Sequence, residues 1–213
     1  MEDRRYIDET LRKYLEDLSA KLPAPGGGSA SALTGATGFA LLCMVLNFTL
    51  GKKEFKDVEE KLKELLKQCE RKRRRLEELI DEDVKVYGEV SRTYALPRNS
   101  DEEKRVRSQA IQKALRDALE VPLEIASLSR EGLETALELI EISNPKLVSD
   151  IGGGAVFLEG AFRGAELNVK INLAAIKDKE LTMRKGEEWD RMSKDVKDIK
   201  EELWHKTLDR MNL

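Results

Sequence analysis

Asp83 is the residue of this sequence that is best placed to transfer protons. It lies on an apolar helical stripe with Leu76, Ile80, Tyr87 and Val90, whereas its two acidic neighbours at 81 and 82 point elsewhere. A carboxylate on the inner face of a helix must be hydrogen-bonded or paired with a cation, or its pKa must rise. Such groups are over-represented at active sites, but a structural cap or an ion pair with an arginine fits the pattern equally well.

A glycine-rich stretch is the second candidate for chemistry. Pro23 and Pro25 disfavour a helix before Gly26, and the three glycines that follow leave the backbone bare. Ser29 is a suitable N-cap for a helix that continues through Ser31. We expect an exposed helix N-terminus able to bind an anion or a carboxylate, and a tight turn packed against another helix is the alternative. The candidate binding residues of this stretch are Pro25, Gly26, Gly27, Gly28, Ser29 and Ser31.

The stretch does not match the common nucleotide-binding loops. A Walker loop needs a lysine directly after its last glycine, and the sequence has no lysine between Lys21 and Lys52. A dinucleotide fingerprint needs a preceding strand, and the residues before Pro23 have the pattern of a helix.

A third pattern lies on the helix expected over residues 146–176. One face of it carries small or hydrogen-bonding residues: Asp150, Gly154, Phe157, Ala161, Ala165, Asn168 and Asn172. Such a face suits a groove that binds a flat polar molecule, or a helix–helix contact with amide hydrogen bonds. Asp150 and Asn168 would be about 27 Å apart on a straight helix. They therefore cannot share a pocket unless the helix breaks or a second subunit intervenes.

Composition narrows the class of protein. The 213 residues are enough to bury a proper core, and the net charge of −3 argues against an electrostatic nucleic-acid binder. Cys43 and Cys69 lack metal-ligand spacing and no signal peptide precedes them, which indicates a reducing cytoplasm. His205 is the only histidine, so a zinc hydrolase is not expected. Proton transfer must then involve carboxylates, lysines, tyrosines or water.

Every segment that must position these residues has a helical pattern. We expect helices over residues 6–20, from Ser29 to Leu50, over 55–94, from 101 to 143 with a kink or restart at Pro122, over 146–176, and after Lys177. No strand alternation occurs, so we predict an all-α, up-and-down bundle of long helices. The uncharged run from Pro23 to Leu50 is long enough to span a membrane, but its small residues favour a central buried helix.

Five short motifs resemble one family in their order along the chain. They are Pro23-x-Pro25-Gly-Gly-Gly-Ser29-x-Ser31-Ala32-Leu33, Asp81-Glu82-Asp83-x-x-x-Tyr87, Val121-Pro122-Leu123, Ser149-Asp150 and Gly164-Ala165-x-x-Asn168-Val169-x-Ile171-Asn172-Leu173. Together they resemble the formiminotetrahydrofolate cyclodeaminase / methenyltetrahydrofolate cyclohydrolase family, which also forms the C-terminal part of bifunctional formiminotransferase-cyclodeaminases. The resemblance covers most of the chain. Val86, where the family often has Ala, and Gly152-Gly153-Gly154 depart from its pattern without removing a reacting group.

The resemblance implies a single domain over residues 1–213, a homodimer, and a role in folate one-carbon metabolism. The expected reaction is cyclodeamination of 5-formiminotetrahydrofolate to 5,10-methenyltetrahydrofolate with release of ammonia. Cyclohydrolysis of the methenyl compound is the alternative, and a non-catalytic helical interaction protein is a second one. The chemistry needs no metal or redox cofactor, and we expect no nucleic acid or membrane partner. The transferase unit of the bifunctional relatives is not part of this sequence, so a separate enzyme would have to supply a formimino substrate.

The resemblance also implies roles for particular residues. We expect Asp83 to be the proton shuttle and Asp150 to give electrostatic or pterin-binding support. The backbone N–H groups of the glycine stretch would hold a substrate carboxylate or the edge of the pterin. Tyr87 belongs to the motif around Asp83 and is a candidate substrate-binding residue. Asn168 and Asn172 would supply neutral hydrogen bonds.

Overall fold

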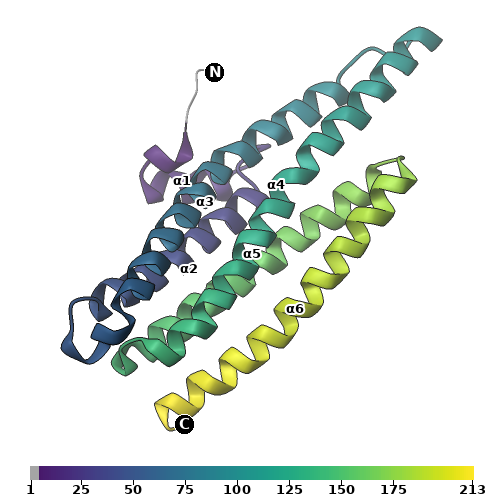
Figure 1. Ribbon diagram of the computed structural model, residues 1–213. Helices are drawn as coiled ribbons and strands as arrows, with labels where there is room; N and C mark the ends of the chain where they lie inside the picture. Colours follow the sequence, from purple (N-terminus) through teal and green to yellow (C-terminus); the bar gives the residue numbers. More distant parts are fainter. Residues whose placement is uncertain (1–4) are drawn as a thin grey trace.

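Six α-helices and three short 3-10 turns make up the part of the chain that the computed structural model describes, residues 5–213 (Figure 1). The elements are η1 (Tyr6–Asp8), α1 (Leu11–Ser19), α2 (Gly27–Thr49), η2 (Lys53–Val58), α3 (Glu59–Tyr94), α4 (Asp101–Ile142), η3 (Pro145–Leu147), α5 (Val148–Ala175) and α6 (Lys179–Met211). No strand is found between residues 5 and 213, and the four long helices α3 to α6 run alongside one another. The predicted all-α bundle of long helices is confirmed.

Helix α2 lies at the centre of the bundle, in contact with α3, α4 and α5. Phe39, Leu42 and Leu46 are fully buried among the core residues of those helices. By length and composition α2 could cross a membrane, but 61% of its most apolar window is buried inside the bundle. That burial is typical of a core helix and agrees with the predicted central position of this segment.

The small residues of α5 pack against α2. A Cβ atom added to Gly38 would lie 2.9 Å from the backbone oxygen of Gly154 and 2.7 Å from Cγ of Leu158. Ala161 and Ala165 are likewise fully buried. The small-residue face of α5 could form either a ligand groove or a helix–helix contact. Its inner residues form the helix–helix contact.

Several predicted helix boundaries were wrong. The first predicted helix is divided by Thr10, whose side chain caps α1 by accepting a hydrogen bond from the Lys13 N–H, 3.1 Å away. The third predicted helix starts four residues late, at Glu59, because a 3-10 turn occupies residues 53–58. Pro122 causes no restart, since α4 continues through it from the capping box at Ser100 to Ile142.

The most informative error concerns the start of α2. We predicted Ser29 as the N-cap, but the helix begins at Gly27 after Gly26. Ser29 is fully buried, and its hydroxyl lies 3.1 Å from that of Tyr14. Its N–H donates a hydrogen bond to the Asp83 carboxylate, 2.9 Å away. A side chain from α3 thus supplies the acceptor that a local cap would provide, and the helix starts two residues earlier.

We expect Gly38→Ala to lower the free energy of unfolding by about 1–3 kcal/mol, because the new methyl group would overlap the Gly154 backbone and Leu158. Urea unfolding followed by circular dichroism measures the change. Gly88→Ala is the matched control, since a Cβ at Gly88 in α3 meets nothing within 4 Å. That variant should gain about 0.5–1 kcal/mol from helix propensity alone. Equal effects of the two substitutions would refute the close α2–α5 contact.

Candidate active site

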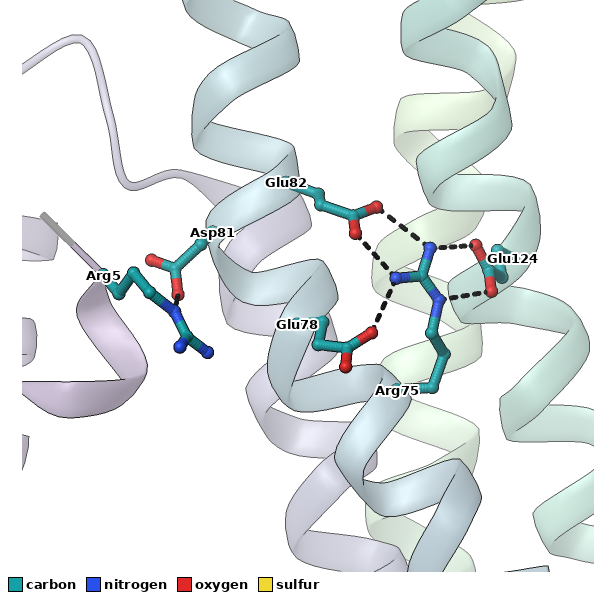
Figure 2. Close-up of polar contacts among 6 residues, drawn as sticks. All are labelled: Arg5, Arg75, Glu78, Asp81, Glu82 and Glu124. Atoms are coloured by element: carbon teal, nitrogen blue, oxygen red, sulfur yellow. Dashed lines mark hydrogen bonds and ion pairs between the residues drawn. The ribbon is translucent and has the colours of Figure 1, made fainter. Parts of the chain in front are cut away.

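Three consecutive carboxylates on α3 point in three different directions. Asp81 accepts a hydrogen bond from the Tyr6 N–H in the N-terminal segment. Glu82 pairs with Arg75 on its own helix, at 2.6 and 3.0 Å (Figure 2). Asp83 points toward the first turn of α2. The prediction that Asp81 and Glu82 point away from the Asp83 face is confirmed.

Arg75 joins this part of α3 to α4. Its guanidinium donates two hydrogen bonds to Glu124 on α4, at 2.7 and 2.8 Å, and one to Glu78, at 2.9 Å (Figure 2). These carboxylates raise the pKa of Arg75 well above its ordinary value. The two-pronged Arg75–Glu124 contact ties α3 to α4 two helical turns before Asp83.

Gly28 allows the Asp83 carboxylate to lie directly on the first turn of α2. A Cβ added to Gly28 would lie 2.0 Å from Oδ1 of Asp83 and 2.6 Å from its Cγ. No side chain other than hydrogen leaves room for the carboxylate there. Oδ2 accepts the hydrogen bond from the Ser29 N–H, and the exposed Gly27 extends the bare backbone beside it.

The environment of Asp83 favours proton transfer. Burial raises the pKa of the Asp83 carboxyl group above its ordinary value, and the hydrogen bond from the Ser29 N–H opposes part of that rise. Among residues 5–213 no cationic side chain lies within 4.0 Å of Asp83. Of the two structural alternatives, the ion pair with an arginine is therefore not what the structure shows, whereas the cap is present, because Asp83 accepts the hydrogen bond of the Ser29 N–H. A carboxyl group in this setting can take up and release a proton nearer neutral pH than an ordinary aspartate.

Tyr14 on α1 completes the buried side of the site. It is 4% exposed, its hydroxyl lies 3.1 Å from Oγ of Ser29, and its ring meets that of Tyr6 edge to face. Burial and the nearby Asp83 carboxylate both raise the pKa of Tyr14, whereas the Ser29 hydrogen bond lowers it. Tyr14 is not among the residues predicted for the site. Nothing in its spacing indicates that it meets Ser29.

Two further predicted site residues lie close to this first turn of α2. A Cβ on Gly27 would be 3.9 Å from Nδ2 of Asn168, whose amide donates to the Gly164 backbone oxygen at 3.2 Å. The Ser31 hydroxyl donates to the Gly27 backbone oxygen at 2.7 Å and fits against the hydrogen atoms of Gly164. Pro25, which follows a cis peptide bond, is buried directly before the turn.

The remaining predicted residues are placed differently. Asn172 donates to the Ala118 backbone oxygen on α4, at 3.4 Å. Tyr87 is 49% exposed, one turn beyond Asp83 on α3. Asp150 lies in the first turn of α5, five turns from Asn168, which corresponds to about 27 Å. Within this chain, Asp150 is therefore remote from Asp83.

The more enclosed of the two described hollows does not coincide with these residues. A cavity of about 290 Å³ is lined by α4, α5 and α6, with Lys200, Trp204 and His205 on one side. None of the predicted site residues lines it. The candidate site is thus an open surface at the start of α2, and its reactive group is the half-buried Asp83 carboxylate.

Comparison with known proteins agrees with this picture. A family model described as formiminotransferase-cyclodeaminase matches residues 10–191. Methenyltetrahydrofolate cyclohydrolase of Methylorubrum extorquens is 35% identical over 205 residues, covering 96% of this chain and 99% of that protein. Formimidoyltransferase-cyclodeaminase of Rattus norvegicus is 32% identical over 83% of this chain and 32% of its own length.

A solved structure shares the fold over almost the whole chain. The crystal structure of a formiminotetrahydrofolate cyclodeaminase from Thermotoga maritima superimposes with a TM-score of 0.86. The two chains are 26% identical, and the match covers 97% of this chain and 98% of that one.

The difference in stability between an Asp83→Asn variant and the unchanged protein should depend on pH. The folded-state pKa of Asp83 is raised, so its contribution to stability is present at low pH and is lost as the pH rises through that pKa. The amide oxygen of asparagine can still accept the Ser29 hydrogen bond. We therefore expect the difference in Tm, variant minus unchanged protein, to increase between pH 4 and pH 8. Calorimetry at several pH values measures this difference, and a constant loss would show that Asp83 serves only as a helix cap.

Proposed function

Because this chain belongs to the formiminotransferase-cyclodeaminase family and is a folate one-carbon enzyme of the cyclodeaminase/cyclohydrolase type, we propose that it hydrolyses 5,10-methenyltetrahydrofolate to 10-formyltetrahydrofolate. The support is the relative of 35% identity that it matches from end to end, which is named a cyclohydrolase. The observation that carries the chemistry is the half-buried Asp83 carboxylate on the bare first turn of α2.

Cyclodeamination, the reaction expected from the sequence, is the second candidate. The Thermotoga maritima protein of the same fold is named a cyclodeaminase, and the name of the Rattus norvegicus relative includes the same word. Both reactions form or consume the same methenyl group that bridges N5 and N10. One site with one proton-transfer group can therefore serve either reaction.

In the hydrolysis, water adds to the cationic methenyl carbon and gives up a proton to the ionised Asp83 carboxylate. The N5–carbon bond then breaks, N5 takes a proton back from Asp83, and the formyl group stays on N10. One proton is released to solvent overall. In cyclodeamination, N10 adds to the formimino carbon, and the same carboxylate would carry the N10 proton to the departing ammonia. A carboxyl group with a raised pKa suits both steps, because it exchanges protons readily near neutral pH.

The surrounding groups would orient the folate. The backbone N–H groups over Gly26–Ser29 can bind a pterin edge or a carboxylate, and the Asn168 amide next to Gly27 can add a neutral hydrogen bond. Tyr87 would contact the substrate from α3, and Ser31 and Asn172 would hold the neighbouring backbone. The reaction needs no metal or redox cofactor. We propose a cytoplasmic homodimer, with Asp150 as the supporting carboxylate.

The two reactions can be separated by following the methenyl chromophore with the purified protein. We expect faster loss of absorbance from 5,10-methenyltetrahydrofolate than in buffer alone. Appearance of the chromophore from 5-formiminotetrahydrofolate, without accelerated loss from the methenyl compound, would replace the hydrolysis by cyclodeamination. Acceleration of neither reaction would contradict both assignments.

Asp83→Asn should lower kcat for the active substrate by about 10²–10⁴-fold, because the amide cannot accept a proton. Glu82→Gln is the matched control, since its side chain points to Arg75 instead of α2. We expect that neighbouring variant to lose some thermal stability but to keep its kcat. Full activity of a folded Asp83→Asn protein would remove Asp83 from the mechanism.

A further inference from the structure

The only two cysteines of the chain lie on neighbouring helices. Cys43 is on α2 and Cys69 is on α3, and these two helices pack against each other in the bundle (Figure 1). Both are free thiols in the structure, and both are buried in the same hydrophobic core, with exposed fractions of 8% and 1%. The proposed function uses neither thiol.

The antiparallel register of α2 and α3 brings the two cysteines to the same level of the bundle. A Cβ on Gly28 would meet the Asp83 carboxylate, and a Cβ on Gly35 would lie 3.2 Å from Cδ1 of Leu76. Seven residues separate these two contacts on either helix. A further step of seven residues reaches Leu42 on α2 and the cysteine of α3. Because the cysteine of α2 directly follows Leu42 and is also buried, the two thiols meet between the helices.

The surroundings of the two thiols make them chemically different. The hydrogen bond between them lowers the pKa of Cys43 and raises the pKa of Cys69. Burial raises the pKa of both thiols, whereas the Arg73 guanidinium, one turn beyond Cys69 on α3, lowers that of Cys43. The Arg73 side chain is itself 31% exposed, so it lies where the thiol pair comes nearest to solvent. Since the thiolate is the nucleophilic form, Cys43 is the more reactive thiol of the two.

We propose that Cys43 and Cys69 are a site of oxidative modification, at which hydrogen peroxide converts the two thiols to a disulfide that joins α2 to α3. The Cys43 thiolate attacks one peroxide oxygen, so an S–O bond forms while the O–O bond breaks, and a sulfenic acid and hydroxide result. The Cys69 thiol then attacks the Cys43 sulfur, and the hydroxyl group leaves with the thiol proton as water. Two electrons pass from the thiols to the peroxide, and each peroxide gives two molecules of water.

The position of the disulfide determines what it changes. From Gly28, where Asp83 meets α2, to Leu42 beside the thiol pair is about 21 Å along the helix. The link therefore fastens α2 to α3 without touching the reactive carboxylate. It restricts the unfolded chain, so the oxidised protein is the more stable form. In a reducing compartment such a bond is transient, because small thiols return both cysteines to the free form by exchange.

Peptide mapping of the unsubstituted protein tests the bond directly. Reduced protein is treated with hydrogen peroxide, alkylated under denaturing conditions and digested without reductant. We expect the peptide that contains Cys43 to be linked to the one that contains Cys69, and dithiothreitol to restore both free thiols. Two alkylated cysteines after peroxide treatment would overturn the proposal. So would a disulfide that joins two chains, which a non-reducing gel reveals.

Single substitutions test which thiol reacts first. In Cys69→Ala the sulfenic acid of Cys43 has no thiol to attack it, so we expect dimedone to label Cys43 after peroxide treatment. Cys43→Ala is the matched control, and the protonated Cys69 thiol should remain unlabelled in it. Alanine suits both positions, because a buried free cysteine packs as a small apolar residue. Equal labelling of the two variants, or labelling of Cys69 alone, would overturn the assigned order of attack.

The melting temperature tests whether the bond fits the folded structure. We expect peroxide to raise the Tm of the unsubstituted protein by about 5–10 °C, and dithiothreitol to reverse the rise. The same treatment of Cys69→Ala should give no rise, which also accounts for any oxidation of methionine. A linked protein with an unchanged or lower Tm would show that the thiols are not placed for a disulfide in the native bundle. None of these measurements depends on the folate reaction.

Discussion

The contact between Asp83 and Gly28 is the constraint on which the site depends. The carboxylate can reach the first turn of α2 only because residue 28 has no side chain, and it then takes the place of the missing N-cap by binding the Ser29 N–H. The same contact removes the carboxylate from water, which raises the pKa of Asp83. One steric condition thus determines where α2 begins, how α3 lies against it, and how readily the acid can exchange a proton.

The other charges near Asp83 are arranged so that none neutralises it. Asp81 is engaged by the backbone of the N-terminal segment, and Glu82 and Glu124 hold Arg75 between α3 and α4 (Figure 2). The Arg75 guanidinium is therefore occupied by other carboxylates. An arginine paired with Asp83 would lower its pKa and stabilise the fold, but it would also make the group a poor proton acceptor near neutrality. Within residues 5–213 the arrangement leaves a half-buried acid without an ion pair, as is typical of functional sites.

The sequence predicted the features that depend on residues close together in the chain, and it missed those that depend on residues far apart. Asp83 was found because its place on an apolar stripe is a local property of α3, and the long helices were found for the same reason. The partners of Asp83 could not be found, because Ser29 is 54 residues away and no periodicity relates the two. The N-cap prediction failed at Ser29 for this reason, since the acceptor comes from another helix. Tyr14 was missed because a buried tyrosine on a stripe has the same pattern as a core residue.

The small-residue face of α5 illustrates a different limit. Its spacing is correct, but spacing alone does not say which side of the helix meets α2 and which side is left uncovered. Gly154 and Ala161 pack inward, whereas Phe157 and Gly160, which lie between them in the sequence, face outward. An uncovered apolar face costs free energy in water, and chains usually cover such faces by association. Spacing therefore identifies the small-residue rows of α5, whereas the packing of α2 against one of them decides which row is buried.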